Sequence, residues 1–81
     1  MNKKNELLVI TMEECGELTQ ACSKIIRKGD NKKEITALKE EAGDVLCMLK
    51  LLESQGYFTW QELEDRVQYK CEKLKKWSNI L

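Results

Sequence analysis

The sequence predicts an all-α fold, in which an antiparallel helical hairpin is followed by a third helix and the chain assembles with other copies into a multi-chain helical bundle. Three observations lead to this prediction. The 81 residues include no proline, and the helix-favouring residues Leu, Glu, Lys and Ala are abundant. Apolar residues recur three and four positions apart in three segments, as on one side of an amphipathic helix. Gly29 and Gly56 interrupt this spacing and divide the chain, residues 1–81, into the helices of a single domain.

The first helix is expected over about residues 4–28. Basic residues occupy its last turn, where they suit the negative end of the helix dipole, and Gly29 then provides a left-handed cap. At ~100° per residue, one side of this helix holds Leu7, Thr11, Leu18, Ala21, Cys22 and Ile25, with Ile10 and Ile26 on its flanks. Leu8, Val9, Met12 and Ile26 lie around the back, and this apolar surface exceeds what one small chain covers, which favours a partner copy.

The second helix is expected over about residues 32–54. Asp30 or Asn31 can cap its start, and Glu34 stands three residues after Asn31, as in a capping box. Gly56 ends it. Its predicted buried face consists of Ile35, Leu38, Ala42, Val45, Leu46, Leu49 and Leu52.

The third helix is expected over about residues 59–76. Thr59 is its predicted N-cap, with Glu62 at the capping-box position, and Phe58 and Leu63 are spaced as a hydrophobic staple. Its apolar stripe consists of Trp60, Leu63, Val67, Cys71 and Leu74 and runs toward Trp77.

The charge and cysteine content narrow the possible partners and location. Fourteen basic and fourteen acidic residues give a net charge of zero, so no electrostatic argument favours nucleic acid or an anionic membrane. No apolar run approaches the ~18–20 residues of a membrane span, and the N-terminal residues lack the apolar stretch of a signal peptide. Without a secretion signal or a C-x-x-C pair, we expect a cytoplasmic protein whose four cysteines are free thiols packed as small apolar side chains.

Acidic residues spaced three apart occur in each predicted helix, and two of these pairs break the apolar pattern. Glu14 projects inside the apolar stripe of the first helix, and Glu17 lies at its margin. On the second helix Glu41 projects among the apolar residues, and Asp44 lies beside them. The pair in the third helix points away from its stripe, as solvated acids do, and consists of Glu62 and Asp65.

An antiparallel hairpin about Gly29 brings the first two pairs together. Glu14 and Asp44 both lie 15 residues from Gly29, and Glu17 and Glu41 both lie 12 residues from it. Residues equally distant from the turn are level in such a hairpin, on helices about 8–10 Å apart. Four carboxylates that converge beside an apolar seam repel one another, so we expect a cation to offset their charge.

A divalent metal ion suits this cluster better than a basic side chain, because Lys39 and Lys50 project toward the outer side of the second helix. Four oxygen ligands, with no histidine and no neighbouring thiolate, favour Mg²⁺ or Mn²⁺ over Zn²⁺. Mg²⁺ held by carboxylates keeps positions open for water and phosphate oxygens, which indicates a phosphorylated substrate. The alternative is that the acids lie on a wetter rim and only solubilise the bundle.

The two acidic segments read Glu13-Glu14-Cys15-Gly16-Glu17 and Glu41-Ala42-Gly43-Asp44. Together they resemble the EExxE…ExxD signature of MazG-like nucleotide pyrophosphohydrolases, of the all-α NTP pyrophosphatase superfamily, over about residues 6–55. The resemblance implies an enzyme that uses Mg²⁺ (or Mn²⁺) to hydrolyse a (deoxy)nucleoside triphosphate to the monophosphate and pyrophosphate. It further implies that the metal ligands are Glu14, Glu17, Glu41 and Asp44. Glu13 joins Glu14 as a catalytic candidate, because it could orient or deprotonate the attacking water; the alternative for Glu13 is a solvated acid.

Basic residues are the candidates for phosphate contacts, with plain surface charge as the alternative: Lys28, Lys32, Arg66, Lys70 and Lys73. The family similarly works as dimers or tetramers, so the expected partners are a nucleoside triphosphate and further copies in a homodimer or homotetramer, and neither nucleic acid nor a membrane. Two other functions stay open. One is that of a superfamily relative with a dedicated substrate, phosphoribosyl-ATP or dUTP, and the other is that of a non-catalytic helical interaction module.

Overall fold

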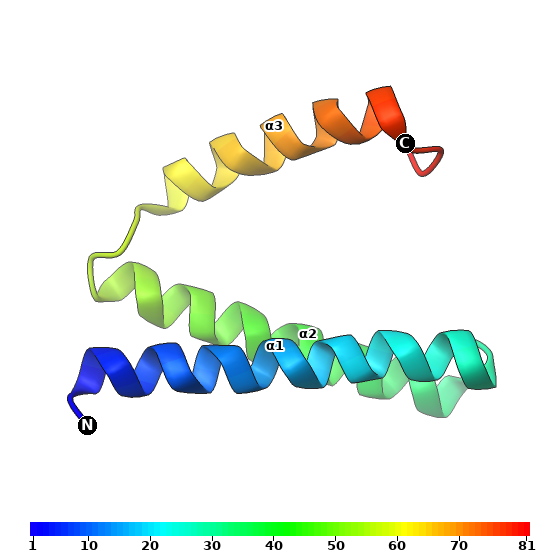
Figure 1. Ribbon diagram of the computed structural model, residues 1–81, viewed down its shortest axis with the longest axis horizontal. Helices are drawn as coiled ribbons and strands as arrows, with labels where there is room; N and C mark the ends of the chain where they lie inside the picture. Colours follow the sequence, from blue (N-terminus) through cyan, green and yellow to red (C-terminus); the bar gives the residue numbers. More distant parts are fainter.

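The computed structural model describes all 81 residues, which form three α-helices and no strand. The helices are α1 (Lys3–Lys28), α2 (Lys32–Ser54) and α3 (Trp60–Trp77). The all-α prediction is therefore confirmed, and the expected ranges differ from these bounds by at most one residue. α1 and α2 lie side by side and antiparallel, whereas α3 diverges from both (Figure 1). Assembly with further copies stays a prediction.

Side chains from the preceding loops cap α2 and α3 at their N-termini. The Asn31 side chain accepts a hydrogen bond from the backbone N–H of Glu34 at 3.0 Å. At α3 the backbone N–H of Glu62 donates to Thr59 Oγ1 at 3.2 Å, and the backbone N–H of Thr59 donates to Glu62 Oε1 at 2.8 Å. The capping box predicted for α3 is confirmed, whereas at α2 only the bond to the Asn31 side chain forms.

Gly29 ends α1 with φ 89° and ψ 163°, and its N–H donates to the Ile25 carbonyl at 2.8 Å. The positive φ agrees with the expected glycine cap. The expected left-handed helical cap is wrong, however, because ψ is extended. Only Asp30 and Asn31 separate Gly29 from α2, so the chain must leave the axis of α1 at once, which an extended ψ allows.

The interface between α1 and α2 contains every buried residue of the chain. Ala21 of α1 and Met48 and Leu52 of α2 form the buried apolar core, and Glu34 is the one buried charged residue. Half-buried apolar side chains surround them: Leu7, Ile10, Leu18, Ile25, Leu38, Val45 and Leu49. The core is thin, as expected for a chain of this length.

Part of each predicted buried face is exposed. On α2 the prediction is wrong for Ile35, Ala42 and Leu46, and on α1 it is wrong for Cys22. The reason is geometric, because each helix is apolar over a wide arc and a single partner helix covers only a stripe of roughly 100°. The cysteines are free, as predicted, but Cys15, Cys22 and Cys47 are exposed and not packed as predicted.

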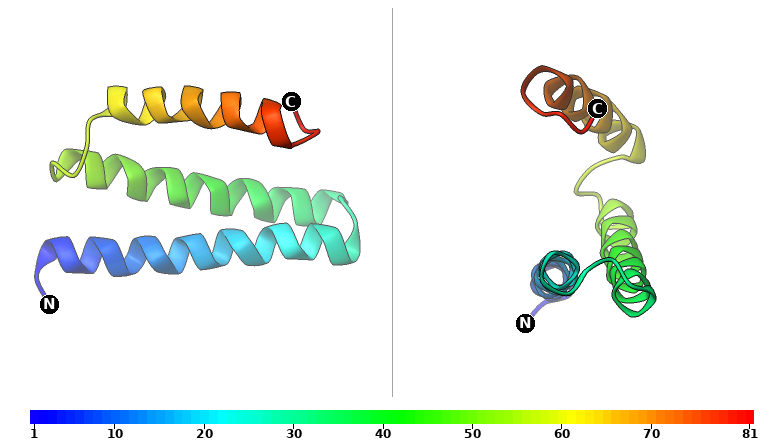
Figure 2. Two further views of the ribbon diagram at one scale, coloured as in Figure 1. Left: turned by 45° about the horizontal axis from the view of Figure 1, so that its top comes forward. Right: turned by 90° about the vertical axis from the view of Figure 1, so that its right-hand side faces the viewer.

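α3 does not pack along α1 or α2 (Figure 2). The chain therefore exposes 6387 Å², whereas a compact monomer of 9.5 kDa exposes about 5,000 Å². Its radius of gyration is 15.0 Å, against roughly 12 Å for a compact domain of this length. None of the three helices combines the length and the apolar character that a membrane-spanning segment needs.

The thin core predicts that single truncations within it are costly. Leu52 is 6% exposed and Leu51 is 42% exposed. Leu52→Ala should lower the free energy of unfolding by about 2–4 kcal/mol, because it removes buried methyl groups and leaves a cavity. Leu51→Ala is the neighbouring control and should cost less than about 1 kcal/mol. Urea unfolding at one fixed chain concentration measures both, and equal losses would contradict this description of the core.

Candidate metal centre

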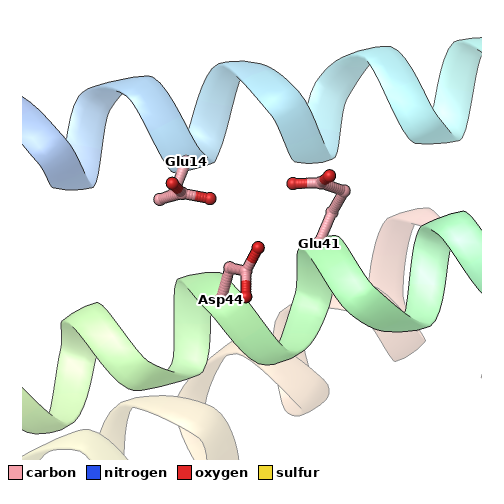
Figure 3. Close-up of side chains that lie close together, drawn as sticks. All are labelled: Glu14, Glu41 and Asp44. Carbon is pink, nitrogen blue, oxygen red and sulfur yellow. The ribbon is translucent and has the colours of Figure 1, made fainter.

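Three carboxylates meet between the first two helices. Glu14 projects from α1, and Glu41 and Asp44 project from α2. Figure 3 shows the three side chains pointing into one space between the two ribbons. One oxygen from each carboxylate lies within 4.8 Å of one oxygen from each of the others. Oxygens at this spacing can all bind one cation.

The register of the hairpin produces this arrangement. Glu14 and Asp44 are equally distant from Gly29 in the sequence, and the structure brings their carboxylates together. Glu41 precedes Asp44 by three residues, so both face the same side of α2. Core residues hold the register on either side of the acids, because Ala21 follows Glu14 by two turns and Met48 follows Glu41 by two turns.

Glu17 and Glu13 lie at the edge of this cluster. Both are exposed, and neither belongs to the group of three whose oxygens lie within 4.8 Å of one another. Their charges nonetheless reach the cluster, since Glu17 acts on Glu14 and Glu41, and Glu13 acts on Glu14. The structure therefore brings together three of the four predicted metal ligands and leaves the fourth nearby.

The environment raises the pKa of Glu14 and of Glu41 above the usual value of 4.5. Loss of hydration is the largest cause for both carboxyl groups, which are half-buried at the helix interface. Repulsion by the charge of Asp44 is the next cause, and the charge of Glu17 follows. Each cause disfavours the charged form, so the cluster in the metal-free chain carries unfavourable electrostatic energy.

No basic side chain relieves this repulsion. The only ion pair in the chain joins Lys75 and Glu72 on α3, and both of those side chains are exposed. Lys39 and Lys50 on α2 are also exposed and form no ion pair. The donor set therefore fits a cation bound from outside, and its carboxylate oxygens suit a hard divalent ion.

The five basic residues predicted to contact phosphate are not paired with these acids. Lys28 and Lys32 flank the turn at the far end of the hairpin. Three are on α3, where they contact aromatic rings instead: Arg66 and Lys73 lie 4.2 and 5.6 Å from the ring centre of Tyr69, and Lys70 lies 5.0 Å from the ring centre of Trp77. These contacts show where the basic residues lie, but they do not connect them to the carboxylates.

An open hollow on the outer side of α2 was not predicted from the sequence. Its volume is about 330 Å³, and it is lined by Gly43, Leu46, Cys47, Lys50 and Leu51. It begins at Gly43, the residue before Asp44, and most of its lining is apolar. The sequence does contain a second apolar stripe at helical spacing on α2. Part of that stripe, Leu46, belongs to the predicted buried face, although it lines the hollow in the structure.

Comparison with known proteins then decides the family. A family model described as the MazG nucleotide pyrophosphohydrolase domain matches residues 2–79, nearly the whole chain. The chain belongs to the MazG family. No curated protein and no solved structure matches it in the corresponding searches. The resemblance found in the two acidic segments is thereby confirmed, and the match extends beyond them to include α3 of this MazG domain.

The raised pKa values predict that the metal-free protein becomes less stable as the pH rises. Between pH 4.5 and the raised pKa, the folded chain binds more protons than the unfolded chain does, so its free energy of unfolding falls as those protons are lost. The contribution of these two carboxyl groups to the free energy of unfolding is complete below pH 4.5, and it disappears as the pH passes through their pKa in the folded chain. Glu14→Gln should flatten this dependence, measured by urea unfolding in EDTA at pH values from 4.5 to about 8.

Asp65→Asn is the matched control, because Asp65 is an exposed acid of α3. It should keep the pH dependence of the wild-type protein. A Glu14→Gln protein whose stability falls as steeply as that of the wild type would show that the carboxylates do not repel one another in the folded chain.

Proposed function

We propose that this MazG domain is a Mg²⁺-dependent enzyme that hydrolyses a (deoxy)nucleoside triphosphate to the monophosphate and pyrophosphate. The observation that carries the proposal is the convergence of Glu14, Glu41 and Asp44 without a basic partner. Such a cluster is unfavourable on its own, and its oxygens suit a hard divalent ion. Mn²⁺ has the same ligand preference and is proposed as a substitute.

In this proposal Glu14, Glu41 and Asp44 hold the ion, and Glu17 completes the set from the next turn of α1. When bound, the ion supplies positive charge against the triphosphate and Lewis acidity at the reacting phosphate. The exposed edge of the cluster leaves room for substrate, since Asp44 and Glu17 are exposed while Glu14 and Glu41 are half-buried.

Glu13 is the proposed residue for handling the attacking water. It is exposed, and its charge acts on Glu14, so it lies at the rim of the site where solvent enters. As a general base it would accept a proton from water as that water attacks the α-phosphorus and pyrophosphate leaves. Glu14 would assist because it helps to hold the metal ion, which carries the positive charge of the site. Glu13 and Glu14 are therefore both proposed to be catalytic.

The remaining substrate contacts involve more than one chain in this proposal. Lys28, Lys32, Arg66, Lys70 and Lys73 are kept as phosphate contacts. Because α3 does not pack along α1 or α2 of its own chain, its three basic residues require a second copy to bring them to a carboxylate cluster. We therefore propose a homodimer or a homotetramer as the active form, located in the cytoplasm.

The first test is turnover. The wild-type protein with Mg²⁺ should release pyrophosphate from at least one member of a panel of nucleoside triphosphates. Glu14→Gln and Asp44→Asn should each lower turnover by about 100-fold or more, because the loss of one carboxylate weakens the hold on the ion. Asp65→Asn should retain wild-type turnover. If the folded protein in Mg²⁺ releases pyrophosphate from no member of the panel, the proposed hydrolysis is wrong. The alternative function, a non-catalytic helical interaction module, then remains.

The second test is metal-linked stability. Mg²⁺ at 100 times its Kd should raise the free energy of unfolding by about 2.7 kcal/mol, because the ion binds only the folded chain. Without metal, Glu14→Gln should be as stable as the wild type or more stable at neutral pH, since it removes one repelling charge. With Mg²⁺ it should gain far less than the wild type. Thermal melts with Mg²⁺ and with EDTA measure both differences, and an unchanged wild-type melt would exclude this metal site.

A further inference from the structure

Tyr69 is an aromatic residue on the charged side of α3. The apolar stripe of this helix contains Leu63, Val67 and Leu74. At ~100° per residue, Tyr69 lies about 140° around the helix from the centre of that stripe. Its side chain is 49% exposed, so it is not a core residue. Burial therefore does not explain an aromatic ring at this position.

Two cations lie against the ring of Tyr69. The guanidinium carbon of Arg66 lies 4.2 Å from the ring centre, and Nζ of Lys73 lies 5.6 Å from it. Arg66 precedes Tyr69 by three residues and Lys73 follows it by four, so all three side chains share one side of α3. The ring quadrupole attracts a cation at this distance. Tyr69 therefore holds two long, flexible basic side chains on the same side of the helix.

A third cation with its own ring contact lies on this side. Lys70 lies 5.0 Å from the ring centre of Trp77, and both residues lie within about 40° of Arg66 around the helix. We call Arg66, Lys70 and Lys73 the cationic stripe. None of the three forms an ion pair, and α3 stands apart from the acids of α1 and α2 (Figure 1). The stripe thus has aromatic neighbours and no acidic partner.

The helix dipole does not account for the cationic stripe. The first six residues of α3 include three acids and no basic residue, whereas residues 66–77 include five basic residues and one acid. The dipole favours cations only within about the last turn of a helix. Arg66 precedes the last residue of α3 by 11 positions and Lys70 by seven, so both lie outside its reach. An anionic ligand would explain them.

The ring contacts leave hydrogen-bond donors available for such a ligand. A guanidinium over the face of a ring keeps the N–H groups on its edges free, and their geometry matches phosphate oxygens. An ammonium group keeps the N–H groups that point away from the ring. Side chains that are already held in place lose less conformational freedom when they bind an anion, so the anion binds more tightly.

We infer that Tyr69 is a positioning residue that holds Arg66 and Lys73 so that, together with Lys70, they bind the polyphosphate chain of a nucleoside triphosphate. Successive cations of the stripe are about 4.5–6 Å apart along the helix axis, so one linear chain of phosphates can contact all three. The identity of the ligand rests on the proposed function, which this assignment deepens by giving the three cations one shared support.

Tripolyphosphate binding in EDTA measures the cationic stripe without hydrolysis, because the metal-free carboxylates of the hairpin repel the probe. Isothermal titration calorimetry on the full chain at low ionic strength should detect binding to the wild type. Tyr69→Leu should weaken binding about fivefold, because it removes both ring contacts. Arg66→Gln should weaken it about tenfold, because it removes a charged donor. Tyr69→Phe should keep the wild-type Kd, since the ring remains.

Two control variants match these changes. Tyr57 is 44% exposed and lies 5.4 Å from a single cation, Nζ of Lys4, so Tyr57→Leu removes a similar ring outside the stripe. Lys75 is an exposed lysine of α3 that pairs with Glu72, so Lys75→Gln removes one charge from the same helix. Both variants should keep the Kd for tripolyphosphate within about twofold of the wild type, because isolated exposed charges contribute little.

Turnover provides a second measurement, which separates positioning from chemistry. With Mg²⁺ and a triphosphate that the wild type hydrolyses, Tyr69→Leu should raise KM about fivefold and leave kcat within about twofold. The reason is that the variant weakens the hold on the phosphate chain and leaves the carboxylates intact. Tyr69→Phe should have the wild-type KM.

Three results would contradict the role of Tyr69. The first is a wild type that does not bind tripolyphosphate, and the second is binding that neither Tyr69→Leu nor Arg66→Gln weakens. The third is a Tyr69→Phe protein as weak as Tyr69→Leu, which would assign the effect to the hydroxyl group. If the variants behave as expected in EDTA but no triphosphate is hydrolysed, the proposed hydrolysis fails and the positioning role of Tyr69 stands.

Discussion

The packing of α1 against α2 is the interaction on which the rest of the molecule depends. It buries the few core residues and brings three carboxylates to the same level. These two results oppose each other, because the core stabilises the pairing while the acids repel across it. Ala21, Met48 and Leu52 are a small core to hold half-buried carboxylates in place. A bound cation would convert the unfavourable part of the interface into a favourable one, which couples the stability of the hairpin to its chemistry.

The two sides of the hairpin differ in chemistry, because one side is acidic and the other is uncharged. Glu17 and Asp44 point to one side of the plane through α1 and α2, and the uncharged stripes of both helices point to the other. This separation follows from helical periodicity, since residues at three- and four-residue spacing keep to one face. A hairpin built this way keeps its acidic surface and its uncharged surface apart, so that a contact on one side does not block a contact on the other.

Local sequence determined the helices almost completely. The caps at Asn31 and Thr59 depend on side chains that bond to backbone within three residues, so the same bonds are available in an isolated segment. The turn at Gly29 is equally local, and it sets the register. Because residues at equal distance from a tight turn must be level, the pairing of Glu14 with Asp44 could be predicted by counting. The carboxylate cluster was for that reason largely visible in the sequence, and the two acidic segments that resemble the MazG signature contain its three residues.

The sequence by itself thus determined which residues are helical, where the chain reverses and which acids are level. Only the tertiary structure decided which apolar stripe of each helix is buried, that Glu17 lies outside the tight group of oxygens, and that α3 stands apart from the hairpin. The physical reason is that α1 and α2 are apolar over more than one stripe, so hydrophobic burial is satisfied by several rotations about the helix axes. The apolar periodicity of the sequence indicates how much surface must be buried, whereas long-range packing determines which partner covers each stripe.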